Sequence, residues 1–162
     1  MSAASEKLPD SFHAKRSLRL WLRLLSCSMR IEKDVRTRLR SQFDATLPRF
    51  DVMAALERSE SGLTMSELSA QLLVSNGNVT GLVQRLVQDG LVAREASAKD
   101  RRIQRVALTD AGRKAFAAMA AEHERWIDEM FSGLSEDEAE ELGSLLQKLR
   151  RSIEEAADDQ RQ

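Results

Sequence analysis

The order of helix and strand signals between residues 64 and 112 constrains the fold more than any other feature of the chain. Thr64-Met-Ser-Glu67 is a capping-box pattern, which predicts a helix start, and a short helix with Met65, Leu68 and Leu72 on its apolar face follows. Asp89-Gly90 suits a helix end, because glycine readily adopts the left-handed conformation there. Two strand-like runs at residues 91–95 and 104–108 precede Thr109, which can cap a further helix. The stretch is predicted to form helix, turn, helix, hairpin and helix.

The second of these helices has one apolar and one polar face. A turn at Leu73-Val74 precedes it, and Ser75 is a good N-cap. The apolar residues recur at helical spacing and predict a buried stripe: Val79, Leu82, Val83 and Leu86. The other face carries amide, hydroxyl and guanidinium groups: Asn76, Asn78, Thr80, Gln84, Arg85 and Gln88. Because such groups bind the edges of adenine and guanine and the methyl group of thymine, this face is predicted to read bases in the major groove.

Two glycines, Gly77 and Gly81, lie within the same helix although glycine is a poor helix former. One interpretation is tight packing against another part of the chain. The other is that the helix backbone approaches a DNA duplex closely, which a larger side chain would block.

The segment between the two strand-like runs, Ala96–Ile103, is too polar to lie in a core. A hairpin there would project Lys99, Arg101 and Arg102 outward, and residues 84–105 hold six Lys or Arg against three acids. Such a hairpin could contact phosphates and insert an arginine into the minor groove. The alternative is a solvated charged loop. Together, the basic hairpin and the helices predict a winged helix-turn-helix that binds double-stranded DNA.

The same stretch resembles the MarR family of bacterial transcription regulators, and the order of helices on both sides also fits. The similarity lies in Thr64-Met-Ser-Glu-Leu-Ser69, Val74-Ser-Asn-Gly-Asn-Val-Thr80, Leu82-Val-Gln-Arg-Leu-Val-Gln-Asp-Gly-Leu-Val92, Asp100-Arg-Arg102, Val106-Ala-Leu-Thr109 and Gly112. In that family an Asp-x-Arg on the wing precedes a Leu-Thr-x-x-Gly junction.

The resemblance implies a homodimer on a pseudo-palindromic operator, usually a repressor that a small molecule or an oxidant releases. It implies that Arg102 enters the minor groove, that Asp100 braces the wing, and that residues 75–84 face the major groove. The run Leu47-Pro-Arg-Phe-Asp-Val-Met53 is similar to the branch of the family that is tied to aromatic-acid catabolism. The family's effectors include phenolic acids and their CoA thioesters.

The fold class is therefore predicted as mainly α with a small β-wing, in a single domain over residues 1–162. The winged helix-turn-helix spans residues 47–109, and dimerisation helices span 11–45 and 110–156. The flanking helices hold apolar stripes larger than a small winged unit can cover, notably Leu18, Trp21, Leu22, Leu25 and Met29, and Leu142, Leu145, Leu146, Leu149 and Ile153. The favoured explanation is a homodimer built from both termini. The alternative is a self-contained helical cap.

Composition excludes several other classes. No stretch approaches the roughly 20 apolar residues of a membrane span, and residues 1–17 lack a signal region, so we expect a cytoplasmic protein without a membrane partner. We find no nucleophile elbow, phosphate-binding loop, dinucleotide fingerprint or metal-ligand spacing, so neither an enzyme nor a bound cofactor or metal is expected. A winged helix that binds protein instead of DNA remains an alternative function.

An organic anion, an aromatic acid or its CoA thioester, is the favoured effector. Residues 11–43 hold nine Lys or Arg against two acids, and several arginines share one face of the first helix: Arg16, Arg19, Arg23 and Arg30. Aromatic and apolar residues could line a cleft nearby: Trp21, Phe50, Met53, Trp126 and Met130. The alternatives are a merely solvated basic face and a redox response through Cys27, although Cys27 is expected to be packed among its neighbours.

Overall fold

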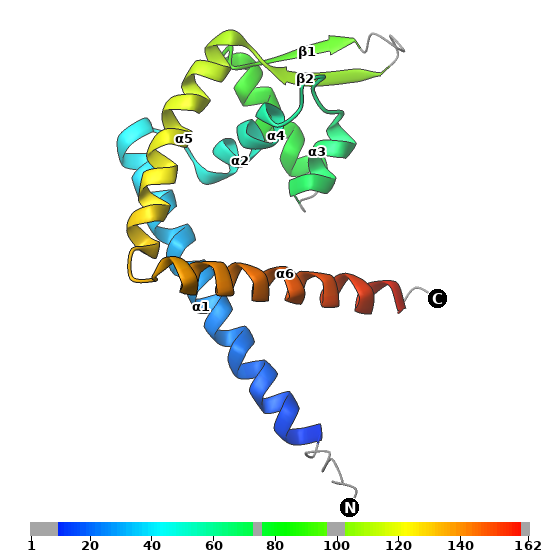
Figure 1. Cartoon of the computed structure of the whole chain (residues 1–162). Helices are drawn as coiled ribbons and strands as arrows, with labels where there is room; N and C mark the ends of the chain where they lie inside the picture. Colours follow the sequence, from blue (N-terminus) through cyan, green and yellow to red (C-terminus); the bar gives the residue numbers. More distant parts are fainter. Residues whose placement is uncertain (1–9, 73–75, 97–102, 160–162) are drawn as a thin grey trace, which may run out of the picture. The chain divides into compact units, whose positions relative to one another are not determined.

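The computed structural model describes residues 10–72, 76–96 and 103–159, which hold six helices and two strands (Figure 1). Contacts divide the chain into two compact units, Met1–Glu124 and Arg125–Gln162, and the fifth helix crosses the boundary between them. The elements are α1 (Asp10–Phe43), α2 (Leu47–Glu57), α3 (Met65–Leu72), α4 (Asn76–Gln88), β1 (Val92–Ala96), β2 (Gln104–Leu108), α5 (Asp110–Phe131) and α6 (Glu136–Asp159). The predicted class, mainly helical with a two-stranded wing, is confirmed.

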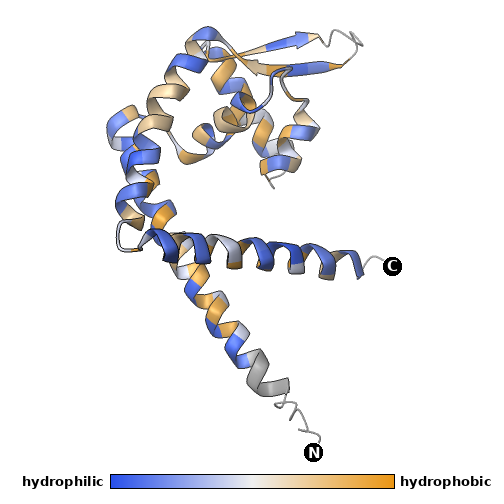
Figure 2. Cartoon of the chain, in the orientation of Figure 1, coloured by the Kyte–Doolittle hydropathy of each residue, from blue (hydrophilic) through white to orange (hydrophobic). Residues whose placement is uncertain are grey.

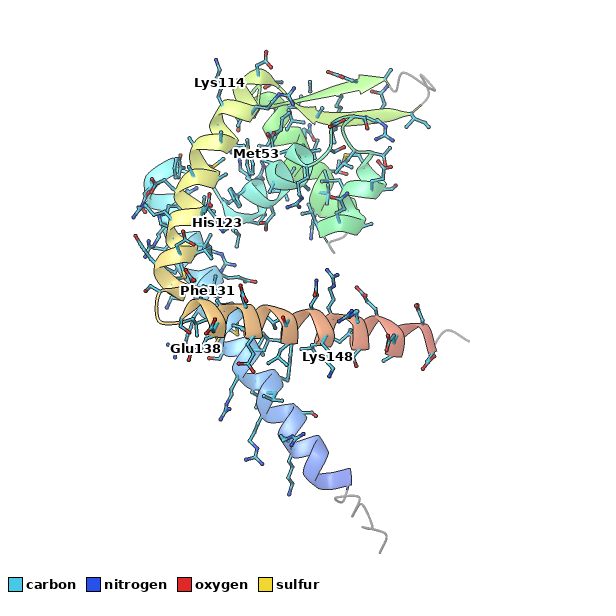
Figure 3. All side chains as sticks on the ribbon, viewed as in Figure 1. Met53, Lys114, His123, Phe131, Glu138 and Lys148 are labelled. Carbon is cyan, nitrogen blue, oxygen red and sulfur yellow. The ribbon has the colours of Figure 1, made fainter. Side chains whose placement is uncertain are left out.

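The core of the first unit is formed where α2, α3, α4 and the hairpin pack together. Its most deeply buried side chains come from elements far apart in sequence: Leu39, Val52, Met53, Leu56, Leu68, Val79, Val83 and Leu86. Figure 3 shows Met53 directed from α2 toward the neighbouring helices, whereas Lys114 points away from α5. This core contacts the side of α4 that carries Val79, Val83 and Leu86.

Helix α2 begins where the sequence predicted, because Thr46 accepts a hydrogen bond from the Arg49 backbone N–H and Pro48 lies in the first turn. Its buried side is broad: Val52, Met53, Ala55 and Leu56 are buried and Ala54 is half-buried. This breadth arises because α2 is covered by α3, α4 and β2 together and not by a single neighbour.

The start of α3 is tied to the hairpin. The Thr64 N–H donates to Glu67 Oε2 at 2.7 Å and the Glu67 N–H donates to Thr64 Oγ1 at 3.2 Å, which confirms the capping box. Just before it, Leu63 pairs with Val106 of β2 through two backbone hydrogen bonds. A side chain on Gly62, at φ +70°, would meet the Val106 carbonyl oxygen at 2.6 Å, so the chain can pass β2 this closely only with glycine.

Strands β1 and β2 pair antiparallel, with Val92 opposite Leu108 and Ala96 opposite Gln104. Val92, Val106 and Leu108 are buried at the base of the hairpin, and the other end is exposed. The predicted hairpin lies within one residue of its expected position. The junction Thr109 then opens α5, where Thr109 Oγ1 accepts from the Gly112 N–H at 3.0 Å.

In the second unit, a capping box opens α6, in which the Ser135 N–H donates to Glu138 Oε2 and the Glu138 N–H donates to Ser135 Oγ. Every residue described in α6 is exposed, including its apolar stripe (Figure 2). Trp126 of α5 is fully buried. None of the helices in the described part of the chain is long and apolar enough to cross a bilayer.

Candidate nucleic-acid interface

Helix α4 has the two faces that the sequence predicts. Val79, Val83 and Leu86 are completely buried, and Leu82 is half-buried. Asn78, Thr80, Gln84, Arg85 and Gln88 are exposed. We call these five exposed side chains the amide face. The core therefore contacts the opposite side of α4 and leaves the amide face exposed.

The two glycines of α4 lie on this exposed side. At 100° per residue, Gly77 and Gly81 lie opposite the buried Val79, Val83 and Leu86. Apart from the backbone of α4 itself, a methyl group added to either glycine would meet no atom of the described residues within 4 Å, and neither has a positive φ. Neither glycine is therefore needed for a tight packing contact among the described residues. Close approach of a partner to the helix backbone stays a prediction.

The C-terminal end of α4 is a complete helix stop. The Gly90 N–H donates to the Val87 carbonyl at 3.0 Å and the Leu91 N–H donates to the Leu86 carbonyl at 2.9 Å. Gly90 has φ +72°, as predicted from the Asp-Gly pair. At the other end, Ser75 and the turn at residues 73–74 lie outside the described residues, as does the side chain of Asn76.

The basic hairpin differs from the prediction at Arg105. This residue is one of the six Lys or Arg counted over residues 84–105, but its guanidinium donates to the Gly62 carbonyl at 2.7 Å and lies 3.4 Å from Glu67 Oε2. Arg105 therefore joins β2 to the start of α3, whereas Arg94 on β1 is exposed. Lys99, Asp100, Arg101 and Arg102 lie outside the described residues, so their contacts with DNA stay predictions.

An ion pair that the sequence did not predict links α2 to the end of α4. Arg49 Nη2 donates to Asp89 Oδ2 at 2.6 Å, across 40 residues of sequence. Arg49 belongs to the run at residues 47–53 that the sequence singled out, but no short-range pattern connects it with Asp89. The pair adds a polar contact between α2 and the end of α4, outside the buried core.

The residues predicted to bind an effector fall into two groups that the structure does not join into one site. Arg16, Arg19, Trp21, Arg23 and Arg30 are exposed along α1. Phe50, Met53 and Trp126 are buried. The ring of Phe50 packs against those of Phe116 and His123, with centroids 5.5 and 4.9 Å away, so it belongs to the core between α2 and α5.

The surroundings of Asp51 and Cys27 could not be predicted from the sequence. Partial burial raises the pKa of Asp51, and the nearby Glu32 raises it further, while His123 and Arg58 act in the opposite direction. Cys27 is exposed on α1, so the expectation that it is packed within the chain is wrong. The apolar side chains about one helical turn before and after it, Leu24 and Ile31, are half-buried.

Comparison with known proteins shows which family shares this order of helices and strands. A model described as the MarR family matches residues 43–103. The HTH-type transcriptional regulator BilQ of Clostridium symbiosum is 34% identical over 93 residues, which cover 57% of this chain and 65% of BilQ, less than two thirds of that relative.

Two solved structures extend the similarity over most of the chain. A MarR family transcriptional regulator from Silicibacter pomeroyi is 34% identical, with a TM-score of 0.74 over 90% of this chain and 99% of that one. The MepR–DNA complex of S. aureus is 25% identical, with a TM-score of 0.67 over 82% of this chain and 94% of that one. The protein therefore belongs to the MarR family of helix-turn-helix transcriptional regulators.

Proposed function

We propose that the protein is a sequence-specific DNA-binding repressor, that it acts as a homodimer, and that a small organic anion releases it from its operator. The observation that carries the DNA-binding part is α4, whose core side is fully buried while its amide face is exposed. Amide and guanidinium groups on an exposed helix match the donor and acceptor pattern of the major groove. The similarity to MepR, which has been solved with DNA, supports the same assignment.

Exposed apolar surface supports the homodimer. Leu18, Trp21, Leu22 and Met29 on α1 are each more than half exposed, and α6 exposes Leu145 and Ile153 to a similar extent. Figure 2 shows these apolar stretches on the first half of α1 and along α6. A self-contained cap would bury them within one chain. A second copy of the chain offers the same stripes in return, as two-fold symmetry requires.

The effector part of the proposal is supported by the arginines of α1. Arg16, Arg19, Arg23 and Arg30 are exposed and lie at helical spacings, so their guanidinium groups can converge on the carboxylate or phosphates of one ligand. The apolar residues predicted to flank them do not add support, because Phe50, Met53 and Trp126 are buried. An aroyl-CoA, with several phosphates, fits such a basic face better than a simple carboxylate.

The DNA-binding proposal is tested by selecting binding sites from a library of random duplexes and measuring affinity by fluorescence anisotropy at fixed salt. We expect a pseudo-palindromic site. Arg85→Ala should lower affinity for it by roughly 5- to 150-fold, the range for a lost contact to guanine. Lys148→Ala removes the same charge from α6 and serves as the matched control (Figure 3). If no site is enriched, or both variants lose affinity equally, α4 is not the reading surface and a protein-binding winged helix becomes the better interpretation.

The homodimer and the effector need separate measurements. Light scattering on the purified protein should give twice the 18.2 kDa mass of the chain, and Leu145→Glu should lower it. A panel of aromatic acids and their CoA thioesters is then added to the protein–DNA complex. We expect a thioester to release wild-type protein from DNA and to have a weaker effect on Arg23→Ala. Release by oxidants alone, abolished by Cys27→Ser, would replace the anion with a redox signal.

A further inference from the structure

The end of α4 is held by two separate parts of the first unit, α2 and the start of α5. We call Asp89–Leu91 the exit corner of α4. Arg49 of α2 donates to the Asp89 carboxylate at 2.6 Å. Thr109 donates from its hydroxyl to the Gly90 carbonyl at 2.7 Å and from its N–H to the Leu91 carbonyl at 3.0 Å. The exit corner therefore fixes α4 against α2 and against the start of α5.

The Arg49–Asp89 pair is not needed to end the helix. The backbone hydrogen bonds of Gly90 and Leu91 already complete the helix stop. An acid in this position is also unfavourable for the helix dipole, because the C-terminal end carries partial negative charge. The side chains are 26% and 46% exposed, and ion pairs exposed to this degree contribute little to stability. A contribution to stability alone is therefore a poor explanation for Asp89. Fixing the direction of α4 would give both Arg49 and Asp89 a role.

We propose that Arg49 and Asp89 are positioning residues, which fix the direction of α4 so that its amide face fits the major groove. The inference rests on the proposed function, since it assumes that α4 reads DNA. Helix α4 has 13 residues and is therefore about 20 Å long. A rotation of about 5° at the exit corner would move its far end by nearly 2 Å, which exceeds the tolerance of direct hydrogen bonds to base edges.

The test compares two variants that remove the same charge. Asp89→Ala and Asp89→Asn both delete one negative charge, but only asparagine keeps an oxygen that can accept from Arg49. If Asp89 were only a solvated acid near the phosphates, both changes would raise operator affinity equally, because they remove the same repulsion. Positioning predicts the opposite sign and an order: Asp89→Ala lowers operator affinity by about tenfold, and Asp89→Asn lowers it less.

Control variants separate an effect on the position of α4 from the effects of losing a negative charge and of losing stability. Glu95→Ala and Glu95→Gln remove a charge from β1 at an exposed residue that forms no ion pair with another described residue, and they should leave operator affinity unchanged or slightly raised. In an Arg49→Gln background, Asp89→Ala should cause no further loss of affinity. Urea unfolding midpoints of all variants should stay close to wild type, and affinity for random duplex should not fall.

Failure of the positioning role and failure of the proposed DNA-binding function would give different results. If Asp89→Ala binds the selected operator as tightly as wild type or tighter, the positioning role is overturned while the DNA-binding function stands. If affinity falls together with the unfolding midpoint for both Asp89 variants, the pair is structural and the inference is overturned as well. If wild-type protein discriminates no duplex from random DNA, the proposed function fails, and this inference fails with it.

Discussion

Replacing Gly112 with alanine tests the packing between α5 and the exit corner of α4. A Cβ atom on Gly112 would lie 1.9 Å from the Leu91 carbonyl oxygen and 2.9 Å from its carbon. Real Cβ atoms are essentially never found closer than 3.0 Å to another heavy atom, so backbone must move by about 1.1 Å at the oxygen. Because both contacts are backbone atoms, no rotation of a side chain can relieve the overlap.

The cost follows from what this movement would break. The shift separates Leu91 and Gly90 from Thr109, whose two hydrogen bonds to their carbonyls contribute about 1 kcal/mol each. Forced overlap in a packed site costs a further ~1–3 kcal/mol. The higher helix propensity of alanine returns up to about 1 kcal/mol. We therefore expect Gly112→Ala to lower the free energy of unfolding by about 2–4 kcal/mol, which for a chain of this length is a fall in Tm of roughly 5–15 °C.

Urea and thermal unfolding, followed by circular dichroism at fixed protein concentration, measure this effect. Gly81→Ala is the matched control, because it makes the same change inside a helix of the same unit where a methyl group meets no atom within 4 Å. It should raise the free energy of unfolding by up to about 1 kcal/mol. If Gly112→Ala is within 1 kcal/mol of wild type, or if the two variants behave alike, the close approach of α5 to Leu91 is not as described.

Three further predictions use the same unfolding and anisotropy assays. Gly81→Ala should lower affinity for the selected operator at least tenfold while raising stability, and unchanged affinity would refute close approach of DNA to α4. Asp51→Asn should stabilise the protein at neutral pH, because the charged carboxylate is the disfavoured form when its pKa is raised. This gain should shrink as the pH falls through the raised pKa and vanish below 3.8, and an equal gain at pH 3 would contradict the assignment. The pKa of Glu67 is lowered, first by the hydrogen bonds with Thr64, so its charge stabilises the fold above pH 4.5 and that contribution is lost at lower pH. Glu67→Gln should therefore be less stable than wild type at pH 7 but not at pH 3, and the same difference at both pH values would exclude the charge as its cause.

Features that depend on residues close in sequence could be predicted well. The capping box at Thr64 and the glycine stop at Gly90 each need partners only three to five residues away, and the structure contains both. The alternation of buried and exposed residues in α4 follows from helical spacing in the same way. These local signals were enough to predict the order of elements and the amide face.

Features that depend on distant partners could not be predicted. Arg49 pairs with Asp89 across 40 residues, and Arg105 reaches Gly62 across 43 residues. Sequence spacing gives no sign of either pairing, so Arg49 had no assigned role and Arg105 was counted only as part of the basic charge of the hairpin. The same reasoning explains Phe50 and Trp126, whose aromatic character suggested a ligand cleft although tertiary packing buries them.

Base-by-base measurement of operator preference tests the central claim, that the amide face of α4 reads DNA, most directly. Affinities of wild type and Gln84→Ala are compared by anisotropy on the selected operator and on every single-base variant of one half-site. We expect Gln84→Ala to lose discrimination at one base pair, by about 1–3 kcal/mol, and to keep it at the other positions. A uniform loss of affinity across all variants, or a preference identical to wild type, would contradict the claim.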